Sequence, residues 1–289
     1  MPSAHRIKTS SDATLFAETF GNSQKPPLLL IMGASGPGMR WEDGFCQKLA
    51  EQFFVIRYDH RDTGQSTTYP PGKPQYTMDT LVDDAFAVLD GLGVASAHVA
   101  GISLGGMIAQ LMAIAHPQRL RSLILIATTP SAPGTDDPDL PVMSKAFLDH
   151  VRKVAPPDWS DKAATIRFIV ERERICAGNS LYFDQGHLEA LWSRIYDHTN
   201  NFASAMQNHF LATGHASWRA QLSAIQLPCL VIHGEEDPVM PLGHGEALAE
   251  EIPHASLLRI PRMGHEVLPS GTWPIVLPAI TALLHTAHV

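Results

Sequence analysis

Residues 98–110 read HVAGISLGGMIAQ, and the character of the chain changes at Ser103. A β-branched run precedes this serine and a run rich in alanine and methionine follows it, so a strand is expected to become a helix here. Gly101 and Gly105 lie two positions to either side. Small residues at these positions let the strand and the helix pass close together, so that a tight turn can present the Ser103 hydroxyl as a nucleophile.

The rest of the chain predicts strands that alternate with helices. Strands are expected at 13–19, 28–32, 53–57, 98–102, 123–127, 230–233 and 257–260. Helical spacing is found at 41–51, 79–92, 104–116 and 275–285. This alternation predicts an α/β fold, with a mostly parallel sheet flanked by helices.

The alternation stops between Thr128 and Gln226. That stretch is compatible with helices and holds ten of the 21 aromatic residues. We predict a core domain at 1–129 and 227–289, and a helical cap at 130–226. The aromatic residues of the cap either line an apolar pocket or form the cap's own core, and the sequence leaves both interpretations open.

Of fifteen histidines, His265 is the best candidate for a base that activates the serine. It lies in RMGHEVL, a glycine-containing loop directly after the last predicted strand. Loops that follow parallel strands meet at one edge of the sheet, which is also the edge expected to carry Ser103. The alternative is a surface histidine.

A carboxylate is needed to orient the imidazole, and HGEEDPVMP at 233–241 offers three. Asp237, beside a proline, is the best placed, and Glu235 and Glu236 are expected to be solvated. The alternative acid lies after the preceding strand, at Asp136 or Asp137.

The chain order Ser103, Asp237, His265, each after a strand, resembles that of the α/β-hydrolase family. YDHRDTGQS at 58–66 is similar to the family's D-x-R-G-x-G-x-S loop, and HGEEDPVMP is similar to its G-x-x-D-x-x-x-P segment. The resemblance covers essentially the whole chain and is closest to the aclacinomycin methylesterase branch. It implies a serine esterase with its cap between the sixth and seventh strands.

Two positions depart from the family pattern. Met32-Gly33 replaces the usual His-Gly, and Asp62 stands where a glycine is usual. The resemblance places one oxyanion-hole donor on the loop after residue 32, so we assign it to the Ala34 N–H with Gly33 as its neighbour. The Leu104 N–H supplies the other donor.

The sequence therefore predicts a carboxylesterase for a small-to-medium ester, acting through an acyl-enzyme, with a methylesterase as the narrower prediction. Met32, Trp192 and Tyr196 are expected to line its pocket. A lactonase, a perhydrolase and a carbon–carbon bond hydrolase on the same triad remain alternatives. A ligand-binding protein that retains a vestigial triad is the alternative outside enzymes.

Composition excludes several other classes. A net charge of −8 and a pI near 6.0 disfavour binding to nucleic acid or to an anionic membrane. The sequence has no metal-ligand or cofactor-binding spacing, no apolar leader and no apolar run long enough to span a bilayer. Its three cysteines are widely spaced, so we expect free thiols in a cytoplasmic protein. The oligomeric state is not indicated.

Overall fold

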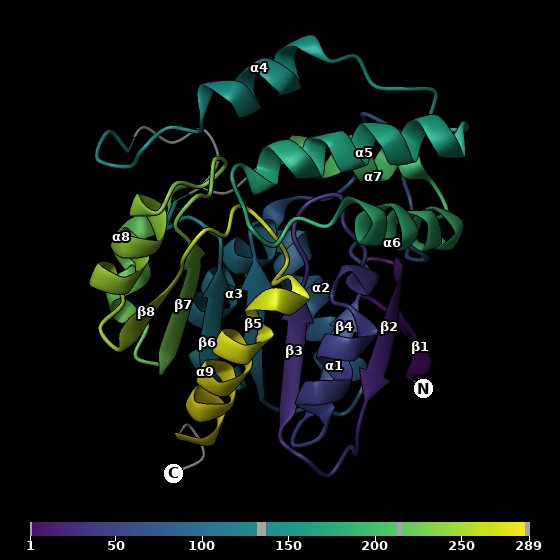
Figure 1. The fold of residues 1–289 in the computed structure, drawn as a ribbon. Coiled ribbons are helices and arrows are strands. Elements are labelled where there is room, and N and C mark those ends of the chain that lie inside the picture. Colours follow the sequence, from purple (N-terminus) through teal and green to yellow (C-terminus); the bar gives the residue numbers. More distant parts are fainter. Residues whose placement is uncertain (1, 132–136, 213–215, 287–289) are drawn as a thin grey trace.

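A computed structural model describes residues 2–131, 137–212 and 216–286. Within these ranges one sheet of eight strands has helices on both faces. Further helices lie above the carboxyl ends of its parallel strands (Figure 1). The strand order is β1-β2-β4-β3-β5-β6-β7-β8. The pairs β1/β2 and β2/β4 are antiparallel, and the remaining pairs are parallel.

The strands are β1 (Ser3–Lys8), β2 (Thr14–Phe20), β3 (Pro27–Ile31), β4 (Phe54–Tyr58), β5 (Ala97–Ile102), β6 (Leu120–Ile126), β7 (Cys229–Gly234) and β8 (Ala255–Ile260). The α-helices are α1 (Asp43–Ala50), α2 (Met78–Gly91), α3 (Leu104–Ala115), α4 (Lys145–Lys153), α5 (Lys162–Ala177), α6 (Gln185–His198), α7 (Phe202–Gln207), α8 (Gly243–Glu251) and α9 (Trp273–Thr286). Short 3₁₀ helices are η1 (Gly38–Arg40), η2 (Pro117–Arg119), η3 (Asn208–Leu211), η4 (Arg219–Ala224) and η5 (Ser270–Thr272).

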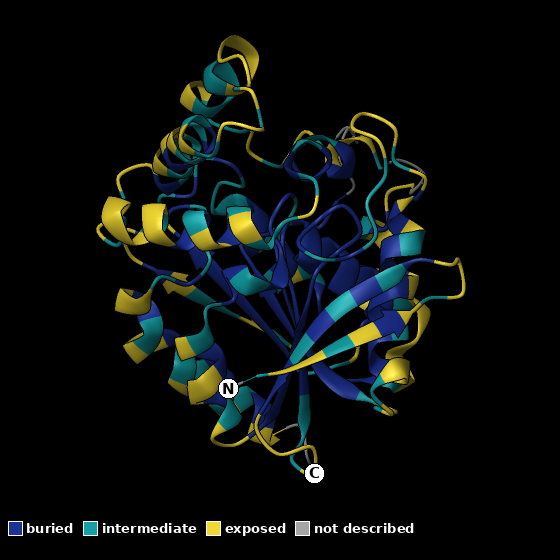
Figure 2. Cartoon of the chain, turned by 90° about the vertical axis from the view of Figure 1, so that its right-hand side faces the viewer, coloured by how far each residue is buried: buried dark blue, intermediate teal, exposed yellow. Residues whose placement is uncertain are grey.

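The sheet separates two apolar cores. Side chains of α2, α3 and α8 pack on one face, and those of α1 and α9 pack on the other. Figure 2 shows the buried strands enclosed by helices that expose their outer faces. Among the described residues, no helix is both long and apolar enough to cross a bilayer.

The predicted alternation and the mostly parallel sheet are confirmed, but the sequence analysis missed β1. Only Ile7 is buried in this edge strand, whose other side chains are exposed or half-buried. An edge strand with so little buried surface does not need an apolar pattern, and its sequence has none. The three cysteines are free thiols, as predicted.

The chain between β6 and β7, residues 127–228, is called the insertion below. It contains α4 to α7, which lie above the sheet in Figure 1. Each of these helices begins with a side-chain cap that satisfies a free backbone N–H; the capping residues are Ser144, Asp161, Asp184 and Asn201. Side chains of α5, α6 and α7 form a third core of their own, whereas α4 buries no residue completely.

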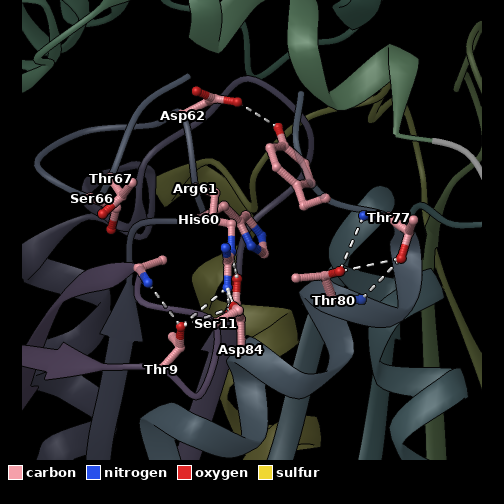
Figure 3. Close-up of polar contacts among 12 residues, drawn as sticks. Thr9, Ser11, His60, Arg61, Asp62, Ser66, Thr67, Thr77, Thr80 and Asp84 are labelled. Carbon is pink, nitrogen blue, oxygen red and sulfur yellow. Dashed lines mark hydrogen bonds and ion pairs between the residues drawn. The ribbon is translucent and has the colours of Figure 1, made fainter. Parts of the chain in front are cut away.

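A fully buried ion pair joins the turn after β1 to the loop after β4 and to α2. The Arg61 guanidinium donates to both carboxylate oxygens of Asp84, at 2.6 and 2.7 Å, and also to Thr9 and Ser11 (Figure 3). It donates to the Tyr69 hydroxyl as well, at 2.9 Å. The Arg61 and Asp84 side chains are 2% and 1% exposed, so neither charge has water to solvate it. The stability of this corner of the molecule therefore depends on both partners being present.

Replacing Asp84 with Ala should lower the free energy of unfolding by about 3–5 kcal/mol, because the Arg61 cation would stay buried without a counterion. Asp83→Ala is the matched control, since Asp83 is the exposed neighbour on the same helix and should change stability by less than about 0.5 kcal/mol. Urea denaturation measures both. Equal stabilities for the two variants would contradict the assigned role of the ion pair.

Candidate active site

Ser103 occupies a strained turn between β5 and α3. Its φ of 53° and ψ of −120° lie in a region that non-glycine residues rarely adopt. A Cβ atom on Gly101 would lie 2.1 Å from the Gly105 carbonyl oxygen, and one on Gly105 would lie 2.3 Å from the Ile31 carbonyl oxygen. The start of α3 therefore approaches both β5 and the end of β3 with no room for side chains at these two positions, which explains the glycines around the serine.

The loop after β3 lies against this turn. A Cβ atom on Gly33 would be 3.3 Å from Ser103 Cβ and 3.9 Å from Ser103 Oγ, so Gly33 is a direct neighbour of the serine. Ala34 follows it and is half-buried, while Met32 is buried. Leu104 is the first residue of α3, where backbone N–H groups have no partner within the helix and the helix dipole is positive.

His265 and Asp237 are joined by a hydrogen bond. His265 Nδ1 donates to Asp237 Oδ2 at 2.8 Å, and the other carboxylate oxygen of Asp237 accepts from the backbone N–H groups of Val239 and Met240. Asp237 follows β7 and His265 follows β8, so both lie at the edge of the sheet where Ser103 follows β5. The bond to Asp237 holds the proton on Nδ1 and leaves Nε2 of His265 as the free base.

The alternative acids have other partners. Asp137 accepts from Ser131 and from Arg219, and Asp136 lies outside the described residues. Glu235 is exposed, and Glu236 faces Arg262 and Asn179. Among the five acidic residues that the sequence analysis considered, Asp237 is the one with a described bond to His265.

The pair is buried, and its charges determine its titration. Burial by itself would raise the pKa of Asp237, but the neighbouring imidazole of His265 outweighs it, so this pKa is lowered. Burial would lower the pKa of His265, but the negative charge of Asp237 and the hydrogen bond to it outweigh this effect, so the pKa of His265 is raised. The site thus favours an aspartate that stays ionised beside a histidine that readily accepts a proton.

Trp192 and Tyr196, two expected pocket residues, lie on α6 in the third core. Both rings pack against Phe202, and the Tyr196 hydroxyl donates to the Trp159 carbonyl. Trp192 is 1% exposed. These contacts belong to the insertion's own packing, and a role in lining a substrate pocket remains a prediction.

The insertion contacts the loops of the site directly. The Arg40 guanidinium, just after the β3 loop, donates to both Glu173 oxygens on α5 at 2.5 and 3.1 Å and lies 4.8 Å from the centre of the Trp192 ring. The backbone N–H of His265 donates to the carbonyl of Cys176, near the end of α5, at 2.8 Å. His265 and the segment after the β3 loop therefore both bond α5.

Four buried histidines, none of them singled out from the sequence, each donate to a backbone carbonyl of a loop at this edge of the sheet. The pairs are His60 with Met32 (2.8 Å), His209 with Arg61 (2.8 Å), His233 with Met240 (2.6 Å) and His244 with Pro141 (2.9 Å). Burial lowers the pKa of all four, that of His60 to about 3. The only sequence signal was the position of His60 inside YDHRDTGQS.

Asp62 takes the glycine position of that loop with a φ of 67°. Its carboxylate accepts from the Tyr69 N–H at 2.6 Å, the Tyr76 hydroxyl at 2.8 Å and Asn208 Nδ2 at 2.8 Å. Three hydrogen bonds thus offset the backbone strain that a glycine would avoid. The departure from the family pattern links the loop to the insertion through Asn208.

Comparisons with known proteins agree with this architecture. A family model described as the alpha/beta hydrolase fold matches residues 26–272. Rhodomycin D methylesterase DauP of Streptomyces sp. strain C5 is 34% identical, over 98% of this chain and 99% of that protein. The 3-oxoadipate enol-lactonase 2 of Acinetobacter baylyi is 30% identical, over 86% of this chain and 85% of that protein. A solved hydrolase structure from Pseudomonas aeruginosa PA01 is 28% identical with a TM-score of 0.69, over 99% of this chain and 98% of that one. The chain belongs to the alpha/beta hydrolase family.

Proposed function

We propose that this protein is a serine esterase that hydrolyses carboxylic esters with Ser103 as nucleophile, His265 as general base and Asp237 as the acid that orients it. The observation that carries the proposal is the 2.8 Å hydrogen bond between His265 and Asp237, at the sheet edge where Ser103 is held in a strained turn. Strain of this kind is kept where the surroundings enforce it, and it clusters at active sites.

The proposed reaction has two steps. Ser103 Oγ attacks the ester carbonyl carbon while His265 Nε2 takes the hydroxyl proton, and the N–H groups of Leu104 and Ala34 bind the oxyanion. The alcohol leaves with the proton from His265, and an acyl-enzyme remains. Water then attacks the acyl carbon, with His265 again accepting the proton, and the carboxylic acid is released as Ser103 regains its hydrogen.

The relatives support a substrate class for this proposal. Similarity to a rhodomycin D methylesterase over nearly the whole chain favours a methyl ester of a small-to-medium acid. The enol-lactonase relative makes a lactone, a cyclic ester open to the same attack, the second candidate.

We further propose that residues 130–226 act as a helical cap over a core formed by 1–129 and 227–289. The contacts of α5 with Arg40 and with the His265 loop support this division, since they put the insertion over the β3 loop and the base. Met32 and Leu104, which flank the turn, are the proposed floor of the pocket. Three free thiols favour a reducing compartment, and we propose the cytoplasm.

Replacing Ser103 with Ala should lower kcat for p-nitrophenyl acetate by roughly 10⁴–10⁶-fold with little change in stability, because the attacking atom is lost. A fluorescent phosphonate should label the wild-type protein once, at Ser103, and leave the variant unlabelled. Mass spectrometry of the labelled peptide reads out the site. A label on another residue, or activity kept by the variant, would contradict the proposal.

Asp237→Asn should reduce kcat about 10⁴-fold, because an amide at this position favours the wrong tautomer of His265. Glu235→Gln and Glu236→Gln are matched controls that remove neighbouring charges, and both should keep near wild-type kcat. Steady-state kinetics on all three variants checks this. If a glutamate variant loses its kcat while Asp237→Asn stays active, the acid is that glutamate.

The pH profile should report the titration of His265. The base must be neutral, and since the pKa of His265 is raised above 6.5, kcat/KM should rise with pH through a midpoint above that value. Glu173 contributes to the raised pKa and Arg40 opposes it. Glu173→Gln should therefore move the midpoint to lower pH.

The control for this shift is Glu171→Gln, which removes an exposed carboxylate from the same helix. Its profile should match that of the wild type. A midpoint that stays fixed or rises in Glu173→Gln would show that Glu173 does not act on the base.

A further inference from the structure

The loop after β3 is held from outside by two imidazole rings. His60 Nε2 donates to the Met32 carbonyl at 2.8 Å, and the Ser35 N–H donates to His209 Nδ1 at 3.0 Å. Both histidines are buried, at 0% and 4% exposure. His60 comes from the loop after β4, whereas His209 comes from η3 near the end of the insertion.

The partners of each ring fix its tautomer. His209 accepts at Nδ1, so its proton lies on Nε2, which donates to the Arg61 carbonyl at 2.8 Å. His60 donates from Nε2 to a carbonyl, so its proton lies there as well. The two rings meet edge to face with their centres 5.5 Å apart. Each is a neutral imidazole with one defined donor and one defined acceptor.

The peptide group 33–34 carries the Ala34 N–H. The two bonds to the histidines fix the peptide groups on either side of it. Met32 O belongs to the peptide group 32–33 and Ser35 N belongs to the group 34–35, so the group 33–34 lies between two anchored planes. Ser35 itself has a φ of 65°, a conformation that would relax without its partner. The two histidines therefore restrain the direction of the Ala34 N–H.

The turn that carries His209 is itself anchored to the core. Asn208 is fully buried, donates to Asp62 at 2.8 Å and to the Pro70 carbonyl at 3.2 Å, and accepts from the Gly72 N–H at 2.7 Å. With Asn208 fixed, the next residue cannot move away from the β3 loop without breaking these bonds.

We propose that His60 and His209 are positioning residues for the oxyanion hole, with His209 coupling the insertion to catalysis. The proposal rests on the esterase function proposed above. It also explains how Met32-Gly33 can replace His-Gly: the support comes from two histidines elsewhere in the chain. An N–H that is aimed in advance stabilises the transition state without reorganisation, so its loss should lower kcat and leave KM unchanged.

The test uses the same two substitutions at both positions, with opposite expected outcomes. An Asn amide oxygen can replace Nδ1 as acceptor, and a Gln amide nitrogen can replace Nε2 as donor. His209 must accept from Ser35, so His209→Asn should keep kcat within about 3-fold, while His209→Gln should lose about 10–100-fold. His60 must donate to Met32, so His60→Gln should be the mild variant and His60→Asn the damaging one.

His98→Gln is the matched control. His98 is fully buried near the start of β5, at the far end of the strand from Ser103, and bonds Ser122 at 2.8 Å. The His98→Gln variant should have a lower melting temperature than the wild type, while its kcat stays within about 2-fold of the wild-type value. A boronic acid, whose adduct with Ser103 places an oxygen in the oxyanion hole, should bind more weakly to the two damaging variants by about the same factor as kcat falls.

A crossed ranking of kcat at the two positions, with KM within about 2-fold, is the expected result. If a variant at one position fails to fold, the order of Asn and Gln at the other position still tests the proposal. If kcat falls equally for Asn and Gln, or follows the melting temperature across all variants including His98→Gln, the positioning role is wrong although the esterase function stands. A wild-type protein that turns over no ester would overturn both.

Discussion

The backbone of Ser103 is held in a conformation that costs about 1–3 kcal/mol, and the arrangement of the surrounding elements depends on it. The neighbouring strand holds the turn in place: the Ser103 N–H donates to the Ile126 carbonyl at 3.0 Å, and the Thr128 hydroxyl donates to the Ser103 carbonyl at 2.7 Å. The close approach of α3 to β5 and to the end of β3 then requires glycines on both sides of the serine. The pairing of β5 with β6 therefore has two roles: it forms part of the sheet, and it holds the turn that presents Ser103.

The other parts of the site come from segments that are distant in sequence. Ser35 and His209 are 174 residues apart, and Arg40 and Glu173 are 133 apart, yet each pair is within hydrogen-bonding distance. The insertion consequently supplies bonds that shape the β3 loop and a charge, that of Glu173, that acts on the proposed base His265. The proposed catalytic groups belong to the core, but their geometry is completed by the insertion.

Much of the fold could be predicted because its strands are buried on both faces and therefore read as continuous apolar runs. The candidate residues Ser103, Asp237 and His265 could be named because each lies in a short local motif directly after a strand. The edge strand β1 was missed since it buries a single side chain. The histidines around the β3 loop were missed for a different reason. They bond backbone carbonyl and N–H groups, and a bond to a backbone group produces no pattern in the sequence. The aromatic content of the insertion likewise predicted apolar surroundings for Trp192, without showing whether these are a pocket or a core.

The buried histidines also tie the site to the acid stability of the protein. His60, His209, His233 and His244 stay neutral in the folded state because burial lowers their pKa values, whereas an unfolded chain would protonate them near pH 6.5. The unfolded state therefore binds more protons below that pH, and each such histidine removes up to about 1.4 kcal/mol of folding free energy per pH unit as the pH falls toward its folded-state value. Since all four hold loops at the carboxyl ends of the strands, acid would act on the same loops that shape the site.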